Sequence, residues 1–118
     1  MTVTATPIAI ERLCDDACEL TLAGELDLHD TPALAAAFDE VEALGARRVL
    51  VDLCAVPFVD STILGVLVAA SRRFETLVLA VGDLRVLRVL EVTGLDRKLL
   101  VERSRSEALA LLTERRSR

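Results

Sequence analysis

Apolar residues at the start of this chain alternate with polar or small residues, which is the two-residue period of a β-strand. Ile8 and Ile10 show this alternation, and Leu20 and Leu22 show it again further along. Residues 15–17, Asp-Asp-Ala, lie between the two segments and predict a tight turn. The first part of the chain is therefore expected to form a hairpin of two half-buried strands.

The next segment has the period of an amphipathic helix. Leu34, Phe38 and Val41 are separated by four and three residues, so they lie on one face of a helix. Residues that favour the ends of helices flank this face, namely Asp30 or Thr31 as the N-cap, Pro32 in the first turn and Gly45 at the end. A helix is therefore expected between the hairpin and residue 45.

Two short runs rich in apolar residues, 48–53 and 77–81, have the composition of strands buried inside a sheet. A helix is expected after each run. The first of these helices covers residues 62–70, which carry no charge, and the second follows Asp83.

The helix after Asp83 mixes apolar and basic residues and is expected to end at Gly94 in a left-handed turn. Its side chains are expected to divide between core and solvent, with Leu84, Leu87 and Leu90 facing inward and Arg85 and Arg88 facing outward. Beyond it, residues 99–101 predict a short edge strand, and Ser104 with Glu107 has the spacing of a capping box for a last helix. That helix is expected to end in Arg115, Arg116 and Arg118.

Alternating strands and helices predict parallel strand pairs joined by right-handed crossovers, and hence an α/β fold. We expect a mixed β-sheet of four to five strands with helices mainly on one face, and a single domain over residues 1–118. Asp27 and Asp60 follow two neighbouring strands, so both should emerge at the edge where α/β sheets generally place their sites. The connection at Phe74-Glu75 is short and has no Gly or Pro, and the pattern does not explain how the preceding helix ends.

The composition narrows the class of protein. Hydrophobic residues make up 53% of the chain and aromatic residues only 3%, so Leu, Val, Ala and Ile must build the core. The net charge of −5 argues against a nucleic-acid-binding surface. No apolar run approaches the roughly 20 residues of a membrane span, and residues 1–7 lack the pattern of a signal peptide. We therefore expect a cytoplasmic protein that binds neither nucleic acid nor a membrane.

Three cysteines, Cys14, Cys18 and Cys54, lack the spacing of a metal site. Cys14 and Cys18 flank the predicted turn and could lie close enough to form a disulfide, although reduced thiols are the favoured interpretation. Zinc would need more ligands than the single histidine, His29, can add. We expect no metal and no cofactor, and His29 is expected to be an exposed loop residue.

Ser61 lies where a buried strand gives way to a helix. The first N–H groups of a helix have no partner inside it, and the helix dipole is positive there, so such a serine can act as a cap, a nucleophile or a phosphorylated switch. Asp60, Ser61 and Thr62 all favour helix starts. One cap is enough, so at least one hydroxyl is not needed for capping.

An enzyme is disfavoured. The chain has no Gly-rich phosphate-binding loop and no nucleophile elbow. A hydrolytic Ser61 would need a base, and His29 is the only imidazole. Asp27 and Asp60 are too few to define a metal site.

The apolar helix over residues 62–70 has no polar face beyond Thr62. A helix that packs on a sheet normally has a polar face toward solvent. Either the neighbouring helices cover its outer side, or an apolar patch is left for a partner.

Three segments, Gly24–Asp27, Val59–Gly65 and Glu91–Asp96, resemble in this order the STAS domain of bacterial anti-sigma-factor antagonists. The middle segment is the specific one. The resemblance implies that Ser61 is phosphorylated by an anti-sigma factor that is also an ATP-dependent serine kinase. The unphosphorylated antagonist binds this kinase and so frees a sigma factor, and a PP2C-type phosphatase restores the unphosphorylated state.

By the same resemblance Asp27 and Asp60 would shape the site and steer the kinase. The expected docking surface consists of Thr62, Ile63, Leu64 and Gly65 with the exposed part of their helix. A STAS scaffold or transporter-associated module without a phospho-switch is a first alternative, and a small nucleotide-binding or hydrolytic protein is a second.

Two features depart from the family pattern. Ile63 stands where many members have Gly, and it would add bulk beside the phosphorylation site and alter partner choice. The connection at Phe74-Glu75 is shorter than in most members and lacks their Gly, which would shorten the partner-facing helix.

Overall fold

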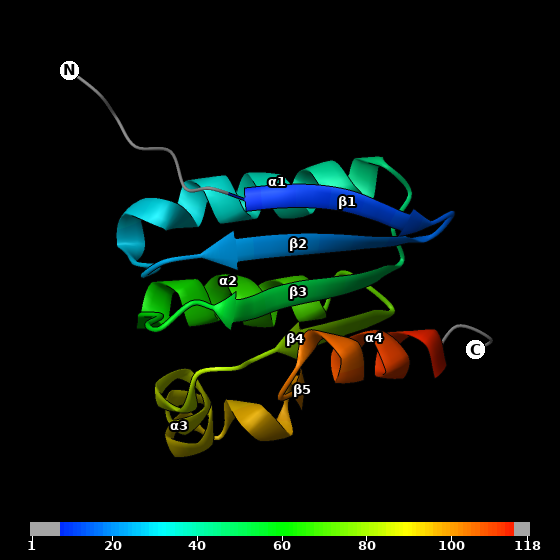
Figure 1. The fold of residues 1–118 in the computed structure, drawn as a ribbon. Coiled ribbons are helices and arrows are strands. Elements are labelled where there is room, and N and C mark those ends of the chain that lie inside the picture. The colour runs from blue at the N-terminus through cyan, green and yellow to red at the C-terminus, as the bar shows by residue number, and fades with distance from the viewer. Residues whose placement is uncertain (1–7, 115–118) are drawn as a thin grey trace.

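Strands and helices alternate through residues 8–114, the part of the chain that the computed structural model describes (Figure 1). The strands are β1 (Ile8–Cys14), β2 (Ala17–Ala23), β3 (Arg48–Ala55), β4 (Thr76–Ala80) and β5 (Leu100–Glu102). The helices are α1 (Thr31–Ala43), α2 (Ser61–Ser71), α3 (Leu84–Thr93) and α4 (Arg105–Glu114), with two short 3-10 helices, η1 (Leu28–Asp30) and η2 (Leu95–Arg97). The predicted helix end at Arg115, Arg116 and Arg118 lies outside the described residues. No helix of residues 8–114 combines the length and the hydropathy needed to cross a membrane.

One mixed sheet with the strand order β1-β2-β3-β4-β5 forms the centre of the fold. The hairpin of β1 and β2 is antiparallel, with Ile10 opposite Leu20, and every later neighbouring pair is parallel. Leu20, Val51 and Leu79 lie side by side across the middle three strands. The α/β fold expected from the alternation of elements is confirmed.

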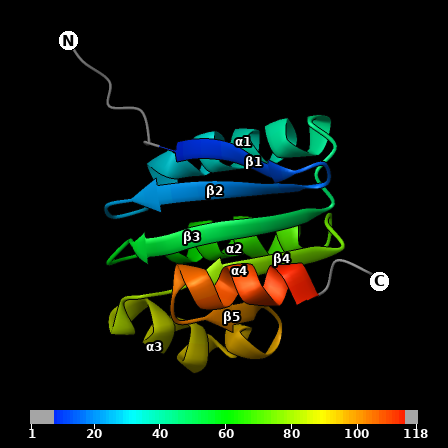
Figure 2. The same ribbon diagram turned by 45° about the vertical axis from the view of Figure 1, so that its right-hand side comes forward.

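The helices cover the two faces of the sheet unequally. Figures 1 and 2 show α1 and α2 behind the sheet, α4 in front of it, and α3 beyond the end of β4. The larger core cluster joins Phe38 of α1, Leu67 of α2 and Leu90 of α3 to the rear face. A smaller cluster packs Ala108 and Leu112 of α4 on the front face. The expectation of helices mainly on one face is confirmed, with α4 as the exception.

Most predicted helix ends are present. Asp83 accepts a hydrogen bond from the Arg85 N–H at 2.8 Å, and Gly94 ends α3 at a φ of 77°. The Ser104 hydroxyl oxygen accepts from the Glu107 N–H at 3.1 Å, as expected for a capping box.

The predicted inner face of α3 was partly wrong. Val86 and Leu90, four residues apart, are buried, whereas Leu84 is 67% exposed. Leu84 precedes Val86 by two residues, which is about 200° around a helix, so its side chain faces away from the packed side. Strand β5 also begins at Leu100, one residue later than expected.

The end of α2, which the sequence left unexplained, depends on an aromatic side chain instead of a glycine. The N–H groups of Arg72 and Arg73 donate to the Ala69 and Ala70 carbonyls in a tightened last turn. Phe74 is buried against Phe38 with ring centroids 6.1 Å apart, and the Arg73 guanidinium lies over the Phe74 ring. Burial of Phe74 therefore turns the chain into β4.

The two cysteines at the hairpin lie on opposite faces of the sheet. Cys18 belongs to the rear core cluster, and Cys14 packs with the cluster under α4. The sheet therefore separates the two side chains, and a disulfide between Cys14 and Cys18 does not fit this fold. Both thiols are free.

Charged side chains hold α4 on the front face at both of its ends. At its start, Arg105 donates to both carboxylate oxygens of the buried Glu19 at 2.7 Å. At its end, the buried Arg48 donates to the Leu112 carbonyl at 2.9 Å and to Asp16 at 2.8 Å.

Candidate functional site

The candidate site lies at the edge of the sheet where β2 and β3 end. The Leu26 N–H donates to the Phe58 carbonyl at 2.9 Å, and the Asp60 N–H donates to the Leu26 carbonyl at 3.2 Å. Leu26 and Val59 thus form a parallel bridge beyond the ends of the two strands. This bridge brings Asp27 and Asp60 out at the same edge, as the predicted topology required.

Asp60 is the N-cap of α2. Its carboxylate accepts from the N–H groups of Thr62 and Ile63, each at 3.1 Å, and from the Thr62 hydroxyl at 2.5 Å. The Thr62 hydroxyl is the main cause that lowers the pKa of Asp60, and the N–H groups of Ile63 and Thr62 lower it further. Asp60 is therefore held as an ionised carboxylate at the start of the helix.

Ser61 is the first residue of α2 and is exposed. Among the described residues its hydroxyl makes no hydrogen bond, whereas the Thr62 hydroxyl is engaged by Asp60. Of the three candidate capping residues in a row, Asp60 alone caps the helix through its side chain. The Ser61 hydroxyl is left available.

Asp27 caps η1, a short helix that the sequence pattern did not predict. Its carboxylate accepts from the His29 N–H at 2.9 Å, and its own N–H donates to the Asp30 carboxylate at 2.8 Å. These bonds close the short helix η1. Asp30 is the N-cap of α1, as expected, but its carboxylate makes no capping hydrogen bond to α1 and accepts from the Asp27 N–H instead. His29 is exposed, as expected, with Nδ1 at 3.5 Å from Asp27.

A shallow groove of about 410 Å³ begins at Ser61 and follows the outer side of α2. The α2 residues that line it recur at intervals of three and four, and they are Ser61, Leu64, Gly65, Val68, Ala69 and Arg72. Thr93 and Leu95, at the end of α3 and the start of η2, form the opposite wall. The outer side of α2 therefore remains open as an apolar stripe, so neighbouring helices do not cover it fully.

The expected docking residues divide between surface and core. Thr62 and Gly65 are exposed. Leu64 is only 6% exposed but contributes to the groove. Ile63 is fully buried, so its expected place on the docking surface is wrong. Its side chain points inward from a helix position that faces the sheet, and its bulk changes the core instead of the surface.

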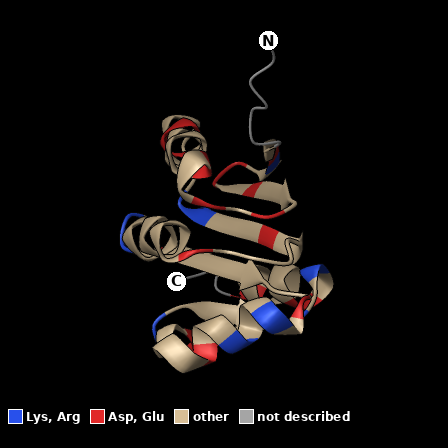
Figure 3. Cartoon of the chain, turned by 90° about the vertical axis from the view of Figure 1, so that its left-hand side faces the viewer, with Lys and Arg blue, Asp and Glu red and all other residues tan. Residues whose placement is uncertain are grey.

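The chemistry available at this edge is that of an exposed hydroxyl among carboxylates. Figure 3 shows acidic residues at the ends of the strands on this side of the molecule. Residues 8–114 contain no cluster of three or more His, Cys, Asp or Glu side chains placed to hold a metal ion. The arrangement can receive a phosphoryl group on Ser61 from an outside donor.

Comparison with known proteins identifies the family. The STAS domain model matches residues 10–108, and the chain belongs to the STAS domain family. An anti-sigma-B factor antagonist of Listeria monocytogenes is 31% identical over 75% of this chain and 82% of its own length. One from Staphylococcus aureus is 34% identical over 65% of this chain and 75% of its own length.

Solved structures show the same fold. An anti-sigma factor antagonist from Mycobacterium paratuberculosis has a TM-score of 0.83 at 24% identity, covering 92% of this chain and 95% of its own. The antagonist SpoIIAA in its unphosphorylated form has a TM-score of 0.70 at 15% identity, covering 95% and 100%. The Bacillus SpoIIAA in its phosphorylated form has a TM-score of 0.68 at 18% identity, covering 90% and 99%.

Proposed function

We propose that this chain is an anti-sigma-factor antagonist that is switched by phosphorylation of Ser61. Unphosphorylated, it binds an anti-sigma factor with serine kinase activity and so releases a sigma factor. The observation that carries the proposal is the free, exposed hydroxyl of Ser61, between the ionised Asp60 and the apolar groove of α2. The curated relatives named anti-sigma-B factor antagonists support the choice of partner.

The proposed switch is electrostatic. Attack of the Ser61 oxygen on the γ-phosphorus of ATP would release ADP and leave about −1.5 to −2 charges on the serine at neutral pH. In the unmodified chain the N–H groups of Thr62 and Ile63 donate to Asp60, so an added phosphate would compete with this carboxylate for them. The new charge would stand beside Asp60 at the mouth of the groove. A partner surface that fits the apolar groove would then have to bury or face an unpaired dianion.

The acidic residues at the edge have separate roles in this proposal. Asp60 fixes the start of α2 and keeps the Thr62 hydroxyl occupied, which directs the kinase to Ser61. Asp27 adds negative charge at the same edge and steers the kinase. The proposed docking surface keeps Thr62, Leu64, Gly65 and the exposed stripe of α2, and it leaves out only the buried Ile63.

Further parts of the proposal rest on the family. A PP2C-type phosphatase would restore the hydroxyl, and the whole chain would act in the cytoplasm as a single STAS domain without catalytic activity of its own. SpoIIAA, which shares the fold, is known in unphosphorylated and phosphorylated forms, which supports a phosphoryl switch in this fold.

The test is to incubate the purified chain with ATP and each serine-kinase anti-sigma factor of its source organism in turn. We expect one phosphoryl adduct, located at Ser61 by mass spectrometry and absent from Ser61→Ala. The matched control Thr62→Ala should still be modified. Stable binding of a kinase without modification would favour the scaffold alternative, and ATP turnover by the chain alone would favour an enzyme.

A further inference from the structure

A second hollow lies at the carboxyl edge of the sheet, between the β3–α2 loop and α3. It is a cleft of about 300 Å³. Glu25, which follows β2, lines one wall, and Arg85 in the first turn of α3 lines another. Open α/β sheets generally bind ligands in crevices beyond the carboxyl ends of their strands, and this volume is at the lower end for such pockets. The cleft is therefore large enough for one small molecule.

The inner part of the cleft is apolar. Val59 and Val86 line it and are buried, and Val89 lies one turn after Arg85 on the same side of α3. Phe58 also lines the cleft and is 47% exposed, so much of its ring is open to contact with an occupant. A molecule that covers these side chains is stabilised by the burial of apolar surface. The ligand must therefore have an apolar body.

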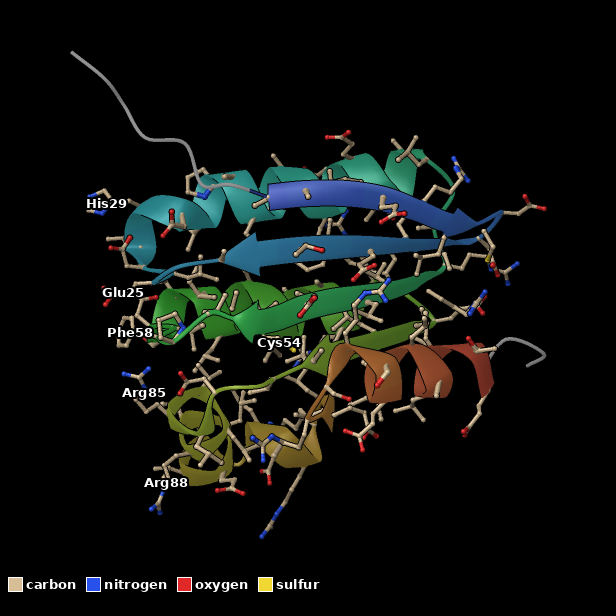
Figure 4. All side chains as sticks on the ribbon, in the orientation of Figure 1. Glu25, His29, Cys54, Phe58, Arg85 and Arg88 are labelled. Atoms are coloured by element: carbon tan, nitrogen blue, oxygen red, sulfur yellow. The ribbon has the colours of Figure 1, made fainter. Side chains whose placement is uncertain are left out.

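Opposite charges stand on two walls of the cleft. Asp83 accepts from Nε and Nη2 of Arg85 at 3.0 and 2.8 Å, and this contact is the main cause that raises the pKa of Arg85. The third nitrogen, Nη1, makes no hydrogen bond to a described residue. The Glu25 carboxylate attracts the guanidinium from the other wall and accepts no hydrogen bond from residues 8–114. Figure 4 shows Phe58 between Glu25 and Arg85. A cationic donor and an anionic acceptor are both left for an occupant.

These charges select the chemistry of the ligand. A simple carboxylic acid would pair with Arg85 but would face Glu25 and the net negative charge of the chain. A simple amine would pair with Glu25 but would face Arg85. A molecule with an ammonium group and a carboxylate on the same carbon satisfies both walls at once. An apolar side chain on that carbon would fill the inner part of the cleft.

We propose that this cleft is a binding site for a free α-amino acid with an apolar side chain. The ammonium group donates to Glu25, the carboxylate accepts from Nη1 of Arg85, and the side chain packs against Phe58 and the apolar inner part. The inference goes beyond the proposed function, since it assigns a small molecule to this edge of the sheet. Residues 57–59, which line the cleft, lead through the N-cap of α2 into Ser61, so a bound amino acid contacts the segment next to the switch.

The test is a titration of the full, unphosphorylated and isotope-labelled chain with L-leucine, followed by the NMR chemical shifts of its amides. We expect saturable shifts at Val59, Val86 and Val89, with a dissociation constant of about 1 mM or lower. The keto acid analogue of leucine, in which a carbonyl replaces the amino group, should bind at least tenfold more weakly. The same loss is expected for isopentylamine, which lacks the carboxylate.

Substitutions in the cleft provide a second readout. Glu25→Gln keeps the size of the side chain and removes its charge, and it should weaken leucine binding at least fivefold. Glu40→Gln, the same change at an exposed position of α1, is the matched control and should alter binding less than twofold. Val89→Phe should abolish saturable binding, because its ring would fill the cleft. The dispersion of the amide signals establishes that each variant is folded.

Several results would overturn the site. Without saturable shifts at these three amides, no amino acid binds in the cleft. Equal affinities for leucine and its keto acid, or a Glu25→Gln variant that binds leucine like its control, would refute the recognition of the ammonium group. The titration needs no anti-sigma factor, so each of these results leaves the phosphoryl switch standing.

Discussion

The carboxylate of Asp60 holds the Thr62 hydroxyl at 2.5 Å, and the serine between these two residues is left without a hydrogen-bond partner among the described residues. One acid thus does two things at the start of α2. It satisfies two N–H groups of the first turn, and it accepts a hydrogen bond from the neighbouring hydroxyl of Thr62.

Asp60→Ala is expected to lower the melting temperature by a few degrees, because two N–H groups of the first turn lose their acceptor. Asp60→Asn should melt close to the wild type, since Asn caps helices about as well as Asp. Thermal unfolding followed by circular dichroism at pH 7 measures both. Equal melting temperatures for the Ala and Asn variants would contradict the capping role.

Gly65 offers a way to fill the groove of α2 without disturbing the core. A Cβ at this position would meet no atom of the described residues within 4 Å. Gly65→Ala should raise the free energy of unfolding by about 0.5–1 kcal/mol, because Gly is unfavourable inside a helix. Urea denaturation measures the change.

The larger variant Gly65→Phe should remain folded and weaken binding of the anti-sigma factor at least tenfold, because its ring would occupy the groove. Gly65→Ala serves as its control and should bind within a few-fold of the wild type. Unchanged affinity of Gly65→Phe would show that the partner docks elsewhere.

The sequence predicted the elements and their order well where the hydrophobic period was clear. The stripe of Leu34, Phe38 and Val41 is buried in α1, as expected. The hydrophobic pattern did not fully predict which residues of α2 and α3 are buried. Nearly every α2 residue is apolar, so the pattern does not indicate which side of this helix faces the core. Only the structure shows that Ile63 is buried and Gly65 is exposed.

The candidate site was predicted in part. The strand order was enough to bring Asp27 and Asp60 to one edge, because parallel strand ends meet there. The bonds between Asp27 and Asp30 were not predicted, since either acid could cap the following helix. A cleft of about 300 Å³ beside Phe58 was also missed, because its lining residues come from three segments distant in sequence. An aromatic residue in a short loop was the one available signal.

The Asp16–Arg48 ion pair predicts how stability changes with acid. Hydrogen bonding to Arg48 lowers the pKa of Asp16 from 3.8 to about 2. A lowered pKa stabilises the fold above the unfolded value, and this contribution is lost as the pH falls from about 4 to 2. Since 37% of the Asp16 side chain is exposed, solvent screening reduces the contribution to about 1 kcal/mol.

Asp16→Asn should therefore cost about 1 kcal/mol at pH 7 and almost nothing at pH 2. Urea denaturation at the two pH values measures the difference. A cost that is the same at both values would show that the charge of Asp16 is not what stabilises the fold.

The buried carboxylate of Glu19 predicts a larger effect on the other end of α4. Arg105→Ala would remove the partner of this carboxylate, which is 3% exposed in the ion pair, and we expect a loss of about 3 kcal/mol in the free energy of unfolding. The double variant Glu19→Leu/Arg105→Leu should recover most of it, because no buried charge remains. A double variant as unstable as Arg105→Ala would contradict this explanation.

The most direct test of the account is the affinity of one anti-sigma factor for two forms of the chain, unmodified and phosphorylated at Ser61. Calorimetry should give a dissociation constant at least a hundredfold higher for the phosphorylated form, which corresponds to about 2.7 kcal/mol. Treatment with a phosphatase should restore the original value. Equal affinities for the two forms would contradict the proposal that a charge at the start of α2 is the switch.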